Sequence, residues 1–240
     1  MSETAGVKSW GAALIGAAGG AVAAVALAIV ALQSGWADRL VRQAMLDNPT
    51  ILLETADALR DQQHAPVIAA NRQAIETPFG SSWQGAKDAD VTLVEFYDYA
   101  CGYCKASLPV LAQLIKEDPK LRVVYREFPV LGPGSEAAAR LALAASKAGK
   151  FMTFHDAMYE AGRPSEATLA KAAAAAGLPA AIPSSPEFDA ELRRNYEIAG
   201  QLGATGTPLF VVGNRVMNGA VGYDALKKAI ADARAKKNES

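Results

Sequence analysis

Two residue types that build structural sites are scarce in this chain. Its 240 residues include only two cysteines, Cys101 and Cys104, and two histidines, His64 and His155. A framework of structural disulfides needs more cysteines, and a closed zinc site needs two more ligands beside this pair. Positive charge is not in excess either, because 24 Lys and Arg face 25 Asp and Glu. We therefore expect no resident metal and no nucleic-acid partner.

Charge is also absent from a long stretch near the N-terminus, between Trp10 and Leu32. As a helix this stretch is long enough to cross a hydrocarbon core of about 30 Å. The apolar part of a secretory signal is usually shorter, roughly 7 to 15 residues. We therefore expect a membrane anchor within residues 1–35. A signal peptide cleaved near Gly35-Trp-Ala37 and a buried helix of a soluble protein are the alternatives.

Residues 36–78 predict a helical arm with two apolar stripes. A break between the stripes is expected at Asn48-Pro49 and another at residues 61–66, because the residue before a proline disfavours the α conformation. An arm this thin cannot form a core of its own. Its stripes need a partner, which is the rest of the chain, the membrane surface or another copy of the chain. The third choice predicts a homo-oligomer through residues 36–75.

The only two cysteines lie where a predicted strand meets a predicted helix. An apolar, β-branched run at residues 91–97 leads to Cys101-Gly-Tyr-Cys104, and a helical pattern follows at once. The free N–H groups and the positive end of that helix favour a thiolate at Cys101. Such a thiolate is both a good nucleophile and a good leaving group in disulfide exchange. Cys104, one helical turn later, is placed to resolve a mixed disulfide; an inert local disulfide and a chance pair are the alternatives.

Glu95 is the one charged residue inside the apolar run at 91–97. Because a buried carboxylate without a partner is costly, its pKa should rise. An exposed or salt-bridged glutamate at the edge of the sheet is the alternative. His155 has no partner at motif spacing and is interpreted as a structural residue.

Two segments carry a resemblance to a known family. Glu-Phe-Tyr-Asp-Tyr-Ala-Cys-Gly-Tyr-Cys-Lys, residues 95–105, resembles the active-site segment of the DsbA-like branch of the thioredoxin superfamily. Gly-Ala-Thr-Gly-Thr-Pro-Leu-Phe-Val-Val, residues 203–212, resembles its cis-proline loop. The resemblance covers about residues 85–235. It implies an α/β, thioredoxin-like domain at 79–240 with a helical insertion at about 134–203, preceded by the transmembrane or signal helix and the helical arm.

The resemblance also implies roles for particular residues. Cys101 and Cys104 would form the redox-active disulfide, with no other cofactor and no metal. Glu95 would match the acidic residue beneath the active site that helps to move protons to and from the second thiol. Gly102-Tyr103 and Thr207-Pro208 would contact the substrate, with a cis bond before Pro208.

The implied function is thiol–disulfide exchange with client proteins that contain cysteines, outside the cytoplasm or in the periplasm. A redox partner would reset the cysteine pair, and residues 10–32 would hold the protein in the membrane. The segment at residues 45–59 resembles ScsC-like proteins, relatives in which it can mediate oligomerisation. An oligomeric disulfide isomerase or reductase, or a Cu(I)-handling copper-tolerance protein, is therefore the alternative.

Overall fold

The computed structural model describes residue 30 and residues 35–238. The chain divides into two compact units, residues 1–58 and 59–240, and the division falls inside a helix. The sequence, in contrast, predicts a boundary near residue 78. The predicted anchor at residues 10–32 lies outside the described residues, except for Val30. Among the helices that are described, none is long and apolar enough to cross a membrane.

The first unit contains helix α2 (Trp36–Asp47) and the beginning of helix α3 (Thr50–Glu76). The predicted break at Asn48-Pro49 is confirmed, because α2 ends just before it and α3 begins just after it. Helix α2 buries none of its residues. Its apolar side chains share one face at helical spacing, and this α2 stripe consists of Trp36, Ala37, Leu40, Val41, Ala44 and Met45.

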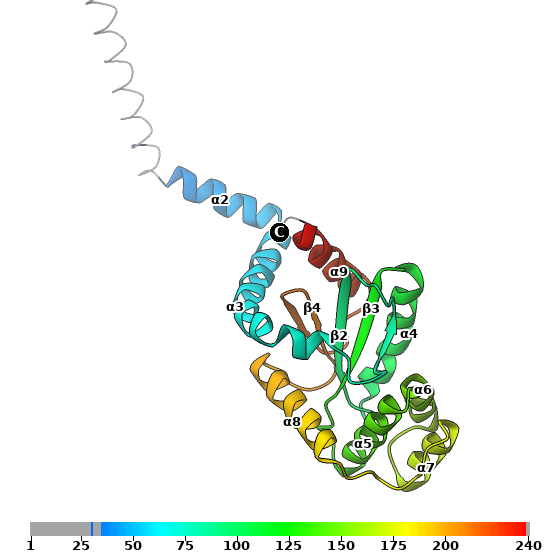
Figure 1. The fold of residues 1–240 in the computed structure, drawn as a ribbon. Coiled ribbons are helices and arrows are strands. Elements are labelled where there is room, and N and C mark those ends of the chain that lie inside the picture. The colour runs from blue at the N-terminus through cyan, green and yellow to red at the C-terminus, as the bar shows by residue number, and fades with distance from the viewer. Residues whose placement is uncertain (1–29, 31–34, 239–240) are drawn as a thin grey trace, which may run out of the picture. The chain divides into compact units, whose positions relative to one another are not determined.

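The second unit is built on a five-stranded sheet with the order β1-β3-β2-β4-β5 (Figure 1). Strands β2 and β3 are parallel, and β1, β4 and β5 each run antiparallel to their neighbours. The central pair is almost completely buried, as its continuous apolar sequence predicts for a sheet covered on both faces. The bounds are β1 Trp83–Gly85, β2 Val91–Tyr97, β3 Leu121–Glu127, β4 Leu209–Val212 and β5 Arg215–Asn218.

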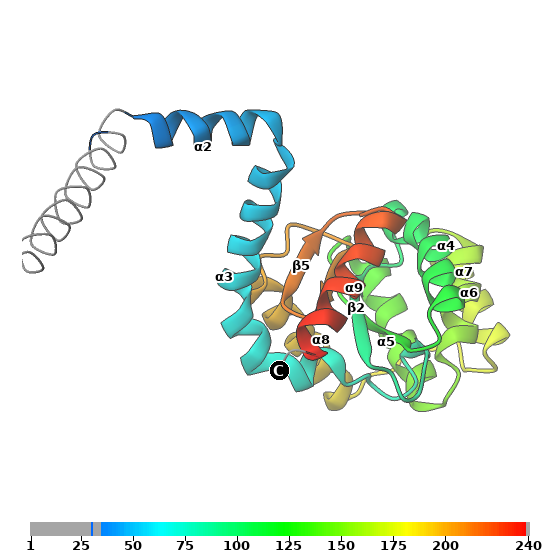
Figure 2. The same ribbon diagram turned by 90° about the horizontal axis from the view of Figure 1, so that it is seen from above.

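Helices cover both faces of this sheet. One face packs against α4, α5, α6 and α9, and α4 and α9 lie side by side on it (Figure 2). The opposite face packs against α8 and the later turns of α3. Four of the helices form the insertion between β3 and β4 that the sequence predicts. The bounds are α4 Gly102–Glu117, α5 Pro133–Lys147, α6 Phe151–Ala161, α7 Glu166–Ala175, α8 Pro186–Gln201 and α9 Tyr223–Asn238.

The predicted break at residues 61–66 is wrong, because α3 continues through Pro66. A proline inside a helix removes one backbone hydrogen bond. Tertiary contacts offset that loss: Ile68 and Ile75 on the following turns are 1% and 0% exposed and pack against the sheet. The later turns of α3 therefore belong to the second unit.

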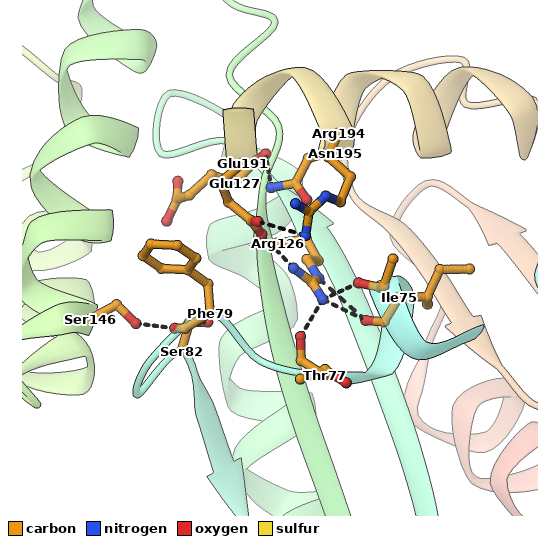
Figure 3. A network of polar contacts seen from close by, with 11 residues as sticks. Ile75, Thr77, Phe79, Ser82, Arg126, Glu127, Ser146, Glu191, Arg194 and Asn195 are labelled. Atoms are coloured by element: carbon orange, nitrogen blue, oxygen red, sulfur yellow. Dashed lines mark hydrogen bonds and ion pairs between the residues drawn. The ribbon is translucent and has the colours of Figure 1, made fainter. Parts of the chain in front are cut away.

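Arg126 of β3 holds the end of α3 against the sheet (Figure 3). Its guanidinium donates hydrogen bonds to the backbone carbonyls of Ala74, Ile75 and Thr77. It also forms an ion pair with Glu191 of α8, and both side chains are buried. The last carbonyls of a helix have no partner within the helix. One buried cation thus satisfies this helix end and joins three elements.

Candidate active site

Cys101 lies between the end of β2 and the start of α4, as the sequence predicts. It is the N-cap residue of α4, with an extended backbone, and its Sγ accepts the backbone N–H of Cys104 at 3.5 Å. The turn before it is closed by Asp98, whose backbone carbonyl accepts the N–H of Cys101 at 3.0 Å. The Asp98 carboxylate accepts the N–H of Ala100 at 2.7 Å. The sulfur of Cys101 therefore sits at the positive end of a helix, in a position where an anion is favoured.

The two cysteines are free thiols in different environments. Cys101 is 7% exposed and Cys104 is 0% exposed. Burial raises the pKa of the Cys104 thiol well above its usual range, and the nearby charge of Glu95 raises it further. Cys104 is therefore a neutral thiol when the pair is reduced, and Cys101 is the sulfur that a large substrate can reach.

The loop at Thr207-Pro208 packs against Cys101, although 106 positions separate Thr207 from it. The thiol of Cys101 donates a hydrogen bond to the carbonyl of Thr207 at 3.2 Å. The peptide bond between Thr207 and Pro208 is cis. Because β4 runs antiparallel to β2, the start of β4 lies beside the end of β2. This pairing brings the cysteine segment and the Thr207-Pro208 loop to the same end of the sheet.

Glu95 lies under the cysteines in the central strand and is 1% exposed. Its Oε1 has no hydrogen-bond partner among the described residues. Burial raises the pKa of Glu95 to about 8, and the negative charge of Cys101 contributes in the same direction. The charge of Glu95 contributes to the raised pKa of Cys104, which places this carboxyl close to the buried sulfur. With a pKa of about 8, Glu95 is protonated at neutral pH and can donate a proton.

The surface beside Cys101 exposes large apolar side chains. Tyr103, in the first turn of α4, is 69% exposed, and no atom lies within 4 Å of where a Cβ on Gly102 would be. Val130 and Leu131 are 41% and 47% exposed, and the N–H of Leu131 donates to the Asp98 carboxylate at 2.9 Å. The sequence analysis did not identify these two residues. Their signal was the apolar pair that directly follows the proline at the end of β3.

The chain is similar to several known proteins. The family of DSBA-like thioredoxin domains matches residues 92–231. A thioredoxin-like oxidoreductase from Silicibacter pomeroyi is 36% identical, with a TM-score of 0.64 over 69% of this chain and 98% of that one. ScsC of Proteus mirabilis, in a transitional conformation, is 29% identical, with a TM-score of 0.66 over 86% of this chain and 99% of that one. A periplasmic thioredoxin-like protein from Salmonella enterica serovar Typhimurium is 28% identical, with a TM-score of 0.62 over 68% and 95% of the two chains.

Curated relatives include Na(+)/H(+) antiporters NhaA of Salinispora arenicola and Salinispora tropica. Each is 30% identical to this chain over 62% of its length. The chain spans 24% of the length of these relatives. The match therefore concerns one part of each antiporter.

Proposed function

Because the chain belongs to the family of DSBA-like thioredoxin domains, we propose that it exchanges disulfides with client proteins through Cys101 and Cys104. The observation that carries this proposal is the asymmetry of the pair. Cys101 sits at the start of α4 beside an exposed apolar surface, whereas Cys104 is fully buried and protonated. The sulfur of Cys101 can react with a client, and the sulfur of Cys104 can react only with Cys101.

The proposed oxidation of a client proceeds in two exchanges. A client thiolate attacks Cys101 Sγ in the Cys101–Cys104 disulfide, the S–S bond breaks, and Cys104 leaves and takes up a proton. A second client thiolate then attacks the client sulfur of the mixed disulfide, and Cys101 leaves as a thiolate. Two electrons pass from the client dithiol to the cysteine pair. A partner that carries a disulfide restores the pair, whereas isomerisation of a client needs no such partner.

Glu95 supplies the proton in this scheme. Protonated Glu95 donates to the sulfur of Cys104 as it leaves and takes the proton back when Cys104 attacks in the reverse direction. A group with a pKa of about 8 is suited to both steps near neutral pH.

Glu95→Gln should have opposite effects on activity and stability. Without the carboxyl proton we expect client oxidation at pH 7 to slow by roughly 100-fold. The raised pKa of Glu95 means that unfolding releases a proton between the ordinary carboxyl value of 4.5 and about 8, so wild-type stability falls as pH rises through this window. The reduced Glu95→Gln variant does not lose stability in this window. Its melting temperature should therefore lie above that of the wild type at pH 8.5 and equal it at pH 4. A variant that is slower and also less stable at pH 8.5 would contradict the role.

The exposed α2 stripe supports a second proposal, that copies of the chain associate with one another. Leu40 and Val41 in its centre are 51% and 54% exposed. We propose that the stripe pairs with the same stripe in other copies of the chain, which brings several cysteine pairs together. A second pair can then act on a client that the first already holds, which favours isomerisation over simple oxidation.

The oligomer is tested in the full chain by Leu40→Asp with Val41→Asp. We expect light scattering to show an oligomer for the wild type and a monomer for this variant, because charge on the paired stripe is costly to bury. Recovery of scrambled ribonuclease should fall, while oxidation of a dithiol peptide stays unchanged. Arg39→Gln with Arg42→Gln, on the opposite face of α2, changes the net charge by the same amount and is the matched control. A wild type that is monomeric would contradict the proposed oligomer and leave the proposal of a monomeric oxidoreductase.

We also propose that the catalytic unit works outside the cytoplasm and that residues 10–32 hold it at the membrane. The structural likeness to a periplasmic thioredoxin-like protein supports this location. Protease treatment of cells tests this location. We expect the catalytic unit to be protected in intact cells and cleaved once the outer envelope is permeabilised. Release of a soluble protein that starts near residue 38 would instead identify these residues as a signal peptide.

A further inference from the structure

A chain of four buried polar side chains lies under the active-site turn and takes no part in the exchange described above. Tyr97 OH is hydrogen-bonded to Glu127 Oε1 and, at 2.9 Å, to Tyr99 OH. Tyr99 OH is in turn 3.2 Å from Nδ1 of His155. Each of the four residues is at most 4% exposed. Strand pairing places Tyr97 opposite Glu127, and α6 brings His155 over them.

His155 sits in an aromatic box and is neutral there. Burial lowers the pKa of His155 to about 3, so the imidazole is uncharged near neutral pH. Burial also raises the pKa of Glu127 well above its usual range. The rings around the imidazole have centroids 4.9 to 5.5 Å away and belong to Tyr97, Tyr99, Tyr125, Phe151 and Tyr159.

The number of protons limits this chain to two directions. Each tyrosine has one O–H to donate, so Tyr97 cannot donate to both of its partners. Either Tyr97 donates to Glu127, Tyr99 to Tyr97 and the Nδ1–H of His155 to Tyr99, or every one of these bonds runs the other way. In both directions His155 ends the chain and holds the hydroxyl of Tyr99.

The chain reaches the cysteines through the turn at residues 98–101. Tyr99 is part of this turn and lies two positions before Cys101. The adjacent Tyr159 donates to the carbonyl of Asp98 at 3.3 Å, and the same carbonyl accepts the N–H of Cys101. The turn is therefore held from the buried side at two neighbouring residues.

We propose that His155 is a positioning residue for the exchange reaction: its hydrogen bond with the hydroxyl of Tyr99 fixes the turn that presents Cys101. This inference rests on the proposed function. The Cys101–Cys104 bond of the oxidised state restrains the same turn, so the hydrogen bond and the disulfide reinforce each other. Without the hydrogen bond the turn of the reduced form can relax, whereas the turn of the oxidised form cannot. Loss of the hydrogen bond should therefore destabilise the oxidised form more than the reduced form.

The test is the exchange equilibrium of the full protein with a glutathione buffer. For His155→Phe, which keeps a ring in the box but cannot form the hydrogen bond, we expect a shift of about tenfold toward the dithiol, which corresponds to about 30 mV. His155→Asn places an amide group near the position of Nδ1 and should restore the wild-type equilibrium. Tyr99→Phe removes the hydroxyl instead, should shift the equilibrium in the same direction, and stands in for His155→Phe if that variant does not fold.

A purely structural role gives a different result. It would lower the melting temperatures of the reduced and oxidised forms equally and leave the equilibrium constant unchanged, which would overturn the inference. Additive shifts in the double variant His155→Phe with Tyr99→Phe would also overturn it, because the two changes remove one shared hydrogen bond. Failure of the proposed function gives a separate result. In that case the cysteine pair of the wild type does not equilibrate with glutathione at all.

Discussion

Cys101→Ser should lower client oxidation and insulin reduction by at least about a thousandfold, to the uncatalysed level. A serine hydroxyl stays protonated near neutral pH and forms no bond to sulfur that could be exchanged. Cys104 cannot take over, because its side chain is 0% exposed and burial raises the pKa of its thiol. The measurement is the initial rate with a reduced dithiol peptide, beside circular dichroism to confirm the fold.

Cys104→Ser is the matched control, since it removes the other sulfur of the same pair. We expect this variant to attack a client disulfide through Cys101 and then to stop, so that a mixed disulfide accumulates. Mass spectrometry after acid quenching identifies the linked sulfur. Mixed disulfides on Cys104 in the Cys101→Ser variant would reverse the proposed roles of the two residues.

Arg126→Met should cost about 3–5 kcal/mol of unfolding free energy, the usual effect of removing one partner of a buried ion pair. The change leaves Glu191 buried, with Arg194 at 3.6 Å as its remaining ion-pair partner among the described residues, and removes the donor to Ala74, Ile75 and Thr77. For a chain of this length the loss corresponds to a melting temperature lower by roughly 10 °C. Urea denaturation of the oxidised protein measures it.

Arg140→Met is the matched control on the surface. Arg140 pairs with Glu136 and Asp189, whose side chains are 54% and 38% exposed. Ion pairs of this kind contribute at most about 1 kcal/mol. Equal losses in the two variants would mean that the end of α3 is not held by Arg126.

The sequence predicted the parts of the site that depend on local chemistry. The apolar run before Cys101 and the helical pattern after it placed the thiols correctly between β2 and α4. The family resemblance placed Thr207-Pro208 at the active site, and the antiparallel pairing of β4 with β2 brings that loop to the end of the sheet where the cysteines lie. The resemblance also implied the helical insertion between β3 and β4.

Features that depend on distant partners were not predictable in the same way. The rule for proline predicted a break near Pro66, whereas burial of Ile68 and Ile75 keeps α3 continuous. Residues 83–85 carry no strand pattern of their own and form strand β1 by pairing with β3. The chain from Glu127 to His155 joins two residues that share no motif, because β-strand register and helix packing bring them together.

One measurement tests the central claim most directly. Oxidised wild-type protein is mixed with an equal amount of a reduced dithiol peptide, and both masses are followed by mass spectrometry at pH 7. We expect the peptide to lose two hydrogen atoms as the protein gains two, with a transient adduct linked through Cys101. A peptide that stays reduced beside protein with an intact Cys101–Cys104 disulfide, while the reduced pair binds Cu(I) tightly, would contradict disulfide exchange and select the copper-handling alternative.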